Sequence, residues 1–358
     1  MQCCFSAPLI QMTHDSERVK GAKNGRRHFG GCARFWGMAW NTAFRPNSLE
    51  SEGRYILDPG TSADSAVAQL AQEGRVRNAA SFSRYLSWRG WDVEGGLRAG
   101  RYMIPNGLDN RGLARLLRSG AREAVRVRFN AARLPSDVAE TVADQLALNP
   151  GDILAAMTDP LTAARNGTDV EAFRTRFIPN TYEMWFDIAA PEFVDRMVRE
   201  WKIWWSLEKR AQAEALGLTP EEVGVLASIV KSETSRMDEA PTVAGLYLNR
   251  LRKGMRLQAD PTLIYALGDF SIRRVLNVHR KIDSPYNTYQ NAGLPPGPIN
   301  FPEPSYLNAV LNAEEHDFIF MCAREDFSGY HAFAQTNREH ERNARRYRKA
   351  LDKQGVYK

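Results

Sequence analysis

Three times between residues 53 and 148, a short strand-like run leads through a turn into an amphipathic helix. In the first copy a Pro-Gly turn is followed by Thr61 or Ser62, either of which can cap the helix, and Gly74 can end it. The second copy starts at Tyr102-Met-Ile-Pro-Asn-Gly, and the third at Val125-Arg-Val-Arg-Phe, where apolar and charged residues alternate. The pattern predicts an α+β fold for this part of the chain.

Small strand–helix modules of this kind often bind a polymer. An equally good interpretation is that they form only a spacer or a packing platform. No ligand motif within residues 53–148 decides between the two.

Length and composition exclude several classes of protein. The 358 residues exceed the roughly 100 to 200 typical of one domain, which predicts two domains. Hydrophobic residues at 43% and charged residues at 25% exclude a disordered chain, a collagen and a coiled coil. The net charge of +6 would suit nucleic acid, anionic lipid or an acidic wall polymer, and does not choose among them.

Motifs for metal, nucleotide or serine-nucleophile chemistry do not occur. The four cysteines form neither a disulfide framework nor a zinc pattern. His316, His331 and His340 stand near acidic residues or alone, without a His-Glu-x-x-His or similar ligand spacing. No Gly-x-Ser-x-Gly elbow, P-loop or dinucleotide glycine pattern is found. We therefore expect no metal and no cofactor.

The basic stretch from Arg338 to Lys349 could contact an anionic lipid or polymer, but a solvated helix face is the better interpretation. No recognised nucleic-acid motif accompanies it, so we expect no nucleic-acid partner.

Residues 1–52 form an irregular N-terminal region in this interpretation. Their best apolar run, Phe35 to Phe44, is shorter than the about 20 apolar residues that a membrane-spanning helix needs. Basic residues precede it, so the layout resembles a signal or anchor whose apolar segment is missing.

Residues 150–217 read as mostly helical and contain many large apolar side chains. Trp201, Trp204 and Trp205 stand at positions i, i+3 and i+4 and therefore share one helical face. A tryptophan stripe could stack on sugar rings, but this spacing is more typical of a buried core, which we prefer.

The clearest helix start in the chain lies at Thr219, which can act as the cap. Pro220 fits the first helical position, and Glu222 completes a capping box.

Along this helix a buried stripe steps by three and four residues, and its next step reaches Glu233. An acid therefore stands where an apolar residue is expected. A buried carboxylate either finds hydrogen bonds or keeps its proton through a raised pKa, and both outcomes suit a general acid. The pattern alone also allows Glu233 to be a surface acid that meets water or Arg236.

Five blocks in the carboxy-terminal half occur in the same order in a known family. They are Leu226-Ala-Ser-Ile-Val-Lys-Ser-Glu-Thr, Val243-Ala-Gly-Leu-Tyr-Leu-Asn-Arg-Leu, Met255-Arg-Leu-Gln-Ala-Asp-Pro-Thr, Ser284-Pro-Tyr-Asn-Thr-Tyr and Gly293-Leu-Pro-Pro-Gly-Pro-Ile. The chain resembles the endolytic murein transglycosylases, the YceG-like family, and the detailed sequence of its motifs looks most like that of members from the Bacteroidetes. The likeness covers roughly residues 53–350.

The resemblance implies a domain organisation. Residues 53–148 would form LysM-like strand–helix repeats, and residues 149–350 a mixed α/β catalytic domain of the YceG-like type. An irregular region, 1–52, would precede them, and a tail, 351–358, would follow.

The resemblance also implies a reaction. The family cleaves the bond between N-acetylmuramic acid and N-acetylglucosamine in nascent peptidoglycan strands, which ends strand elongation. Glu233 matches its catalytic residue: it would protonate the glycosidic oxygen and then, as a carboxylate, take the proton of the muramyl C6 hydroxyl while a 1,6-anhydro ring closes. Because that hydroxyl is tethered, one carboxylate suffices, whereas a hydrolase generally needs two.

Polar residues in the proline-rich loops after Glu233 are the candidates for substrate binding. Amide and hydroxyl groups can bind the N-acetyl groups and steady an oxocarbenium-like sugar. The candidates are Gln258, Asp260, Tyr286, Asn287 and Thr288. Asp260 could equally be structural and cap the turn at Pro261.

Two features depart from the family pattern. Many relatives have a glutamate two positions before the catalytic one, where this chain has Lys231. Family members usually begin with a transmembrane helix, so we expect the N-terminus here to be truncated or mis-called. The resemblance otherwise implies a single-pass inner-membrane location, with the catalytic domain in the periplasm.

Peptidoglycan glycan strands are the implied partner, and a peptidoglycan synthase is an open second one. Two alternative functions remain beside the enzyme. One is a non-catalytic peptidoglycan-binding scaffold in which Lys231 marks a decayed active site. The other is a basic nucleic-acid binder.

Overall fold

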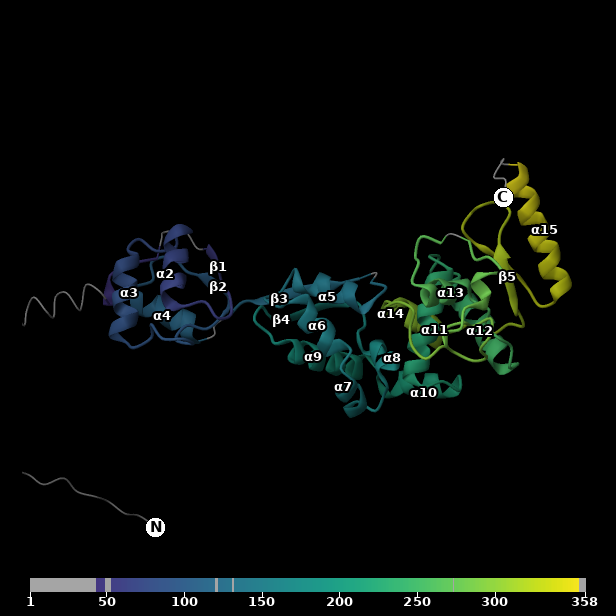
Figure 1. The fold of residues 1–358 in the computed structure, drawn as a ribbon, viewed down its shortest axis with the longest axis horizontal. Helices are drawn as coiled ribbons and strands as arrows, with labels where there is room; N and C mark the ends of the chain where they lie inside the picture. Colours follow the sequence, from purple (N-terminus) through teal and green to yellow (C-terminus); the bar gives the residue numbers. More distant parts are fainter. Residues whose placement is uncertain (1–42, 49–52, 120–121, 131, 273, 354–358) are drawn as a thin grey trace, which may run out of the picture.

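The computed structural model describes residues 43–48, 53–119, 122–130, 132–272 and 274–353. Three units follow one another along its long axis (Figure 1). Each has one two-stranded antiparallel sheet and one hydrophobic cluster. The predicted mixture of helices and strands is confirmed. Nearly all of the irregular region expected over 1–52 and most of the tail lie outside the described residues.

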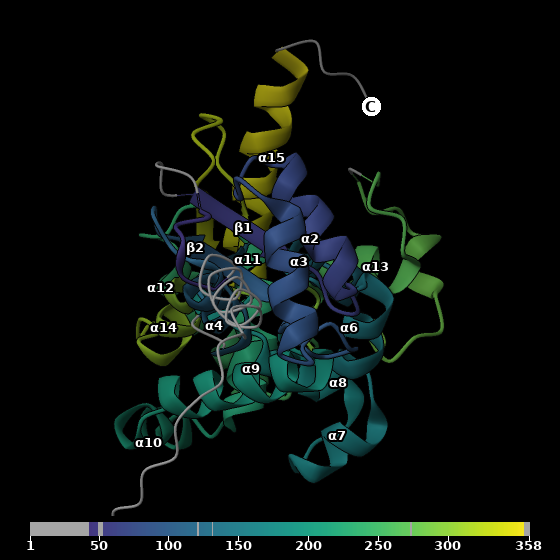
Figure 2. The ribbon, with the colours of Figure 1, turned by 90° about the vertical axis from the view of Figure 1, so that its left-hand side faces the viewer.

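The first unit packs its helices against strands that pair with each other. Its elements are β1 (Gly53–Leu57), α2 (Ala63–Gln72), α3 (Ala79–Trp88), β2 (Gly100–Ile104) and α4 (Asn110–Ser119). Ser62 caps α2 by accepting a hydrogen bond from the Ser65 amide, as the sequence predicted. Tyr55 of β1 pairs with Tyr102 of β2, and both rings are buried. Figure 2 shows this unit from its free end.

The first two copies of the sequence pattern therefore form one unit, and the third copy lies elsewhere. Its strand, β3 (Ala124–Phe129), pairs with β4 (Asn180–Trp185) in the second unit. Val127 and Phe129 are buried there in a cluster that includes Phe193. The pairing joins residues more than fifty positions apart, which a local strand–helix pattern does not reveal. The LysM-like character of residues 53–148 stays a prediction.

Helices make up most of the second unit. They are α5 (Pro135–Ala143), α6 (Pro150–Met157), α7 (Pro160–Arg165), α8 (Val170–Phe173), the 3₁₀ turn η1 (Arg174–Arg176) and α9 (Ala190–Trp204). The tryptophan stripe lies at the end of α9. Trp201 and Trp205 are buried in the hydrophobic cluster of the third unit, and Trp204 packs against that cluster. The interpretation of the stripe as core is confirmed.

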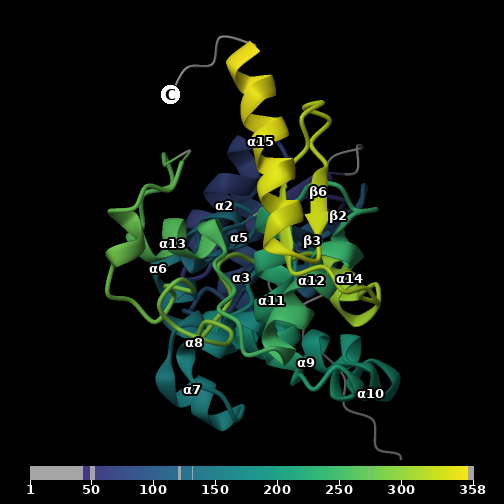
Figure 3. The same cartoon turned by 90° about the vertical axis from the view of Figure 1, so that its right-hand side faces the viewer.

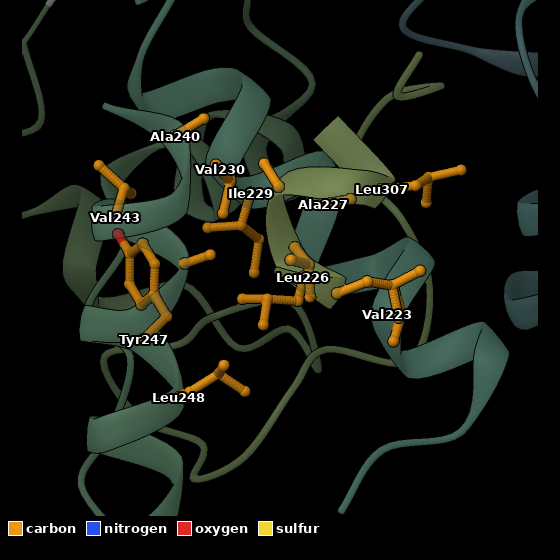
Figure 4. Close-up of a cluster of buried hydrophobic side chains, with 14 of the residues drawn as sticks. Val223, Leu226, Ala227, Ile229, Val230, Ala240, Val243, Tyr247, Leu248 and Leu307 are labelled. Atoms are coloured by element: carbon orange, nitrogen blue, oxygen red, sulfur yellow. The ribbon is translucent and has the colours of Figure 1, made fainter. Parts of the chain in front are cut away.

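The third unit is built around α11. Its elements are α10 (Leu207–Ala215), α11 (Pro220–Glu233), α12 (Ala240–Arg252), α13 (Asp260–Leu267), η2 (His279–Lys281), α14 (Pro304–Leu311), β5 (Phe320–Ala323), β6 (His331–Ala334) and α15 (Asn337–Lys353). The α11 side chains Leu226, Ile229 and Val230 are fully buried and face α12 (Figure 4). The β5–β6 hairpin and α15 lie together at the far end of the molecule (Figure 3).

Candidate active site

Glu233 is the last residue of α11 and faces a cavity of about 470 Å³. The helix begins as predicted, because Thr219 accepts from the Glu222 amide and Glu222 accepts from the Thr219 amide. The cavity is lined by Glu233, Leu246, Tyr247, Arg250, Leu257, Gln258, Asp260, Arg280, Tyr289, Phe320, Met321, Cys322, Ala323, His331, Asn337, His340 and Glu341. Its wall therefore combines α11, α12, the start of α13, the 280–289 loop, the β5–β6 hairpin and α15.

The Glu233 carboxyl is held by a single tyrosine hydroxyl. Tyr247 donates a hydrogen bond to Glu233 Oε1 at 2.7 Å. Burial raises the pKa of Glu233, and the nearby Asp260 charge adds to this; the Tyr247 hydrogen bond and His331 act in the opposite direction. Arg236 lies elsewhere, where it donates to the Ser328 carbonyl at 2.6 Å. The contact with Arg236 that the surface interpretation allowed is therefore not formed, and Glu233 is partly buried in the cavity wall.

Tyr247 reaches Glu233 from α12. Its ring is buried next to Val243 and across from the apolar face of α11 (Figure 4). Burial and the adjacent carboxyl both raise the Tyr247 pKa, so the phenol keeps its proton and remains a donor.

Asp260 and Tyr289 form a second polar pair on the cavity wall. Tyr289 donates to Asp260 Oδ1 at 2.6 Å. Asp260 is the first residue of α13, and the cap residue before it, Ala259, makes no side-chain cap. The Asp260 carboxylate is thus directed at Tyr289 in the cavity, and no capping hydrogen bond from it is found among the described residues.

Gln258 has an unusual backbone conformation, with a φ of 54° in the left-handed region. The backbone amide of Gln258 donates to the Thr288 carbonyl at 3.1 Å, and Thr288 Oγ1 accepts from the Ala259 backbone amide at 3.0 Å. The Gln258 side-chain oxygen accepts from Arg250 at 2.6 Å. Two neighbouring chain segments therefore hold Gln258 against the cavity.

The profile of the YceG-like family matches residues 56–346 of the chain. The chain belongs to the YceG-like family. A protein of Bacillus subtilis named endolytic murein transglycosylase is 26% identical over 306 residues, which cover 81% of this chain and 83% of that protein. A protein of the same name from Streptococcus pneumoniae strain R6 is 24% identical over 328 residues, covering 82% of this chain and 56% of that protein.

A solved structure of a YceG-like protein has a similar fold. The YceG-like protein of Listeria monocytogenes is 24% identical and superposes with a TM-score of 0.53, covering 82% of this chain and 99% of that one.

Of the predicted binding residues, only Gln258 and Asp260 line the cavity of this YceG-like protein. Thr288 is buried and holds the 258–259 segment. Asn287 is buried and binds the Arg280 and Ile282 carbonyls at 3.1 and 2.8 Å. Tyr286 is buried and donates to Glu171 of α8. These three side chains shape the loops behind the cavity rather than line it.

Several cavity residues lie in the blocks but were not among the candidates. Tyr247 and Arg250 belong to the second block, and Tyr289 ends the fourth. His331 lies outside the five blocks, and the sequence offered it only as a possible metal ligand without the spacing for one. Among the described residues, no group of three or more His, Cys, Asp or Glu could hold a metal ion. No helix in the described part of the chain is long and apolar enough to cross a membrane.

Lys231 points away from this cavity. Its ammonium donates to the Phe301 carbonyl at 2.9 Å and to Glu303 at 2.8 Å. It lines a separate cavity of about 350 Å³ together with Arg133, Tyr265 and Asn300. Lys231 is therefore not among the residues that line the Glu233 cavity.

We expect Lys231→Met to lower the free energy of unfolding and to leave catalysis nearly intact. The partly buried Phe301 carbonyl and Glu303 would lose their donor, at a cost of about 1–2 kcal/mol. Thermal unfolding and the rate of strand cleavage measure the two effects, with the exposed Lys253→Met as the control. A rate loss beyond about tenfold at unchanged folding would contradict this placement of Lys231.

Proposed function

We propose that this YceG-like protein is an endolytic lytic transglycosylase that cleaves the bond between N-acetylmuramic acid and N-acetylglucosamine in peptidoglycan strands. The observation that carries the proposal is a carboxyl group at a polar cavity, with burial raising its pKa and a neutral phenol as its donor. The names of the curated relatives support the same substrate and reaction.

Glu233 is suited to the first step of this reaction. A raised pKa keeps the carboxyl protonated closer to neutral pH, where it can donate to the glycosidic oxygen as the bond breaks. The carboxylate that remains is stabilised by the Tyr247 hydroxyl. The muramyl C6 hydroxyl then attacks the anomeric carbon and loses its proton, which closes the 1,6-anhydro ring. General acid–base catalysis of this kind contributes about 10²- to 10⁴-fold.

Polar groups around Glu233 would bind the sugars. Arg250, Arg280, Gln258 and Tyr289 supply donors, and Asp260 supplies an acceptor. An N-acetyl group offers one donor and one acceptor, and a muramyl lactyl group offers a carbonyl or carboxylate. The two arginines match the second kind of group best.

The products of the unmodified enzyme test the proposal. Purified strands are digested and then reduced with borohydride, and the fragments are analysed by mass spectrometry. A lytic transglycosylase yields 1,6-anhydromuramyl ends, which borohydride leaves unchanged. Muramitol ends, formed by reduction of free reducing ends, would exclude the lyase reaction.

Hydrolysis is the second candidate, because Asp260 lines the same cavity as Glu233 and its charge acts on it. Hydrolases generally use such a pair of carboxyl groups, with one of them activating water or attacking the sugar. The borohydride experiment separates the two reactions, since only hydrolysis produces reducible ends.

We expect Tyr247→Phe to shift the pH dependence of cleavage upward. The Tyr247 hydrogen bond lowers the pKa of Glu233, so its removal raises that pKa further. Activity that needs protonated Glu233 would then persist to a higher pH, by about 0.5–1 unit, while the maximal rate falls about tenfold. The kcat–pH profile measures both. A descending limb that moves to lower pH would contradict the assigned acid.

The first unit is proposed to bind glycan strands, as a LysM-like module would. A cavity of about 210 Å³ on it is lined by Phe44, Tyr85, Trp88, Trp91, Arg89, Arg111 and Arg115, with Ala43. Trp88 is 67% exposed there. Aromatic faces can stack on sugar rings, and arginines suit carboxylates.

We expect Trp88→Ala in the full chain to reduce co-sedimentation with insoluble peptidoglycan about three- to tenfold, the loss of one stacking contact. Cleavage of short soluble strands should stay unchanged. Equal sedimentation of the two proteins would favour the spacer interpretation. The inner-membrane anchor, the periplasmic location and a synthase partner also remain proposals that rest on the family.

A further inference from the structure

A buried glutamate and a histidine form a pair at the edge of the Glu233 cavity. Glu239 precedes α12 and its side chain is only 5% exposed. One of its oxygens accepts from the His331 backbone amide at 2.7 Å, and the other accepts from His331 Nδ1 at 2.8 Å. Thr234, the residue after Glu233, also donates to Glu239, at 3.2 Å. The carboxylate is thus fixed by three donors.

This arrangement determines which imidazole nitrogen carries the proton. A carboxylate only accepts hydrogen bonds, so Nδ1 of His331 must be the protonated nitrogen of the neutral ring. Nε2 then keeps its lone pair. Among the described residues, Nε2 has no hydrogen-bond partner, and the ring lines the same cavity as Glu233. His331 therefore brings a ring nitrogen with a free lone pair to the set of residues that line the cavity.

We propose that His331, oriented by Glu239, is the general base of ring closure and that Glu233 acts as the acid. The inference rests on the proposed lyase reaction and divides the proton transfers between two groups. It replaces the use of Glu233 for both roles.

The reaction balances with these groups alone. Glu233 gives its proton to the glycosidic oxygen as the bond from the anomeric carbon to that oxygen breaks. The C6 oxygen bonds to the anomeric carbon, and its proton passes to His331 Nε2. After the products leave, the proton returns from the imidazolium to the Glu233 carboxylate, directly or through water, and both groups are restored.

The surroundings of Glu233 favour this division of roles. After it has donated its proton, the Glu233 carboxylate still accepts from Tyr247 at 2.7 Å, and that hydrogen bond weakens it as a base. The imidazolium formed on His331 faces the negative Glu239 at the same moment. Two opposite charges therefore develop at sites that the protein has already prepared for them.

His331→Asn tests the role of Nε2 without removing the contact with Glu239. The shorter amide can still donate to Glu239, but it offers no basic nitrogen to the cavity. We expect kcat to fall about 10²-fold while KM changes less than about threefold. The control is His279→Asn, the same change in a histidine outside the cavity.

The pH profile and chemical rescue separate catalysis from structure. The titratable or charged groups that line this cavity with His331, or contact it, are Glu233, Glu239, Tyr247, Arg250, Asp260, Arg280, Tyr289, Cys322, His340 and Glu341. A general base gives the kcat–pH profile of the unmodified enzyme an ascending limb. We expect that limb to vanish in His331→Asn, and added imidazole to restore part of the activity of His331→Ala.

Glu239→Gln gives an independent result. The glutamine amide can donate to His331 Nδ1, which favours the tautomer that carries its proton on Nε2 and has no base in the cavity. We expect a kcat loss of about 10²-fold there as well. A kcat of His331→Asn within about threefold of the unmodified enzyme, or an unchanged ascending limb, overturns the proposal. So does a failure of imidazole to rescue folded His331→Ala. If the unmodified enzyme forms no 1,6-anhydro ends, the proposed function itself fails. If it does form them, the results of these variants bear only on the role of His331.

Discussion

Glu233→Gln protein should release no detectable 1,6-anhydromuramyl ends from peptidoglycan strands, with a rate at least about 10³-fold below that of the unmodified enzyme. Glutamine keeps the size of the side chain and can still accept from Tyr247, so the cavity and strand binding should persist. The amide cannot donate a proton to the leaving oxygen. Mass spectrometry of the digest and co-sedimentation with peptidoglycan measure the two properties.

The same variant should be more stable than the unmodified protein at neutral pH. Burial raises the Glu233 pKa, so the folded protein binds more protons than the unfolded chain between the ordinary value of about 4.5 and the raised value. Stability therefore falls as pH rises through that window, and glutamine avoids this loss. We expect the melting temperature to rise by a few degrees, with a gain that grows with pH across the window.

Glu214→Gln, on the exposed side of α10, is the matched control and should change neither property. A Glu233→Gln protein that still forms anhydro ends at more than about a tenth of the normal rate would remove Glu233 from the chemistry. The gain in melting temperature of Glu233→Gln over the control should be larger at pH 7 than at pH 4.5. A smaller gain at pH 7 would contradict the raised pKa of Glu233.

Arg250→Met should give the largest loss of stability among changes around the site. Arg250 is buried and has no acidic partner within the described part of the chain; it donates to the Arg256 carbonyl at 3.0 Å, the Ile319 carbonyl at 2.8 Å and the Gln258 side chain at 2.6 Å. Burial lowers the pKa of Arg250 because the charged guanidinium is desolvated, and removal of the charge recovers part of this desolvation free energy. We expect a net cost of about 2–4 kcal/mol, because three acceptors lose their donor.

Catalysis should fall as well, because Arg250 joins α12, the Gln258 segment and the start of β5 into one wall of the cavity. We expect about a tenfold to hundredfold loss in kcat/KM, measured at a temperature where the variant is folded. Arg252→Met, two residues away on the exposed side of α12, is the control for the loss of positive charge. Equal unfolding midpoints in urea for the two variants would show that Arg250 does not tie the wall together.

Some features of the site followed from short-range patterns. The Thr219–Glu222 capping box and the stepping apolar stripe act within a few residues of each other, so the sequence predicted the start of α11 and the place of Glu233 on its buried stripe. The preference for a buried tryptophan stripe was correct for the same reason. Five ordered blocks predicted the family, and the match over residues 56–346 confirms it.

The choice of side chains around Glu233 did not follow from such patterns. Asn287 and Thr288 are polar residues in a loop, and only the structure shows that both are buried beneath it. Tyr289, in the same block, reaches the cavity because Asn287 accepts from its backbone amide at 3.0 Å and turns the loop. Neighbouring residues in one block thus point in opposite directions, and the direction depends on packing.

By itself, the sequence determined the mixture of helices and strands, the family, and a capped helix whose buried stripe reaches an acid, because caps and periodicity are properties of neighbouring residues. The tertiary structure alone decided what meets that acid. Tyr247 comes from 14 positions away, and the contact between Glu239 and His331 spans 92. Such contacts depend on how α12 and the β5–β6 hairpin pack against α11, and burial at that junction is what raises the pKa of Glu233.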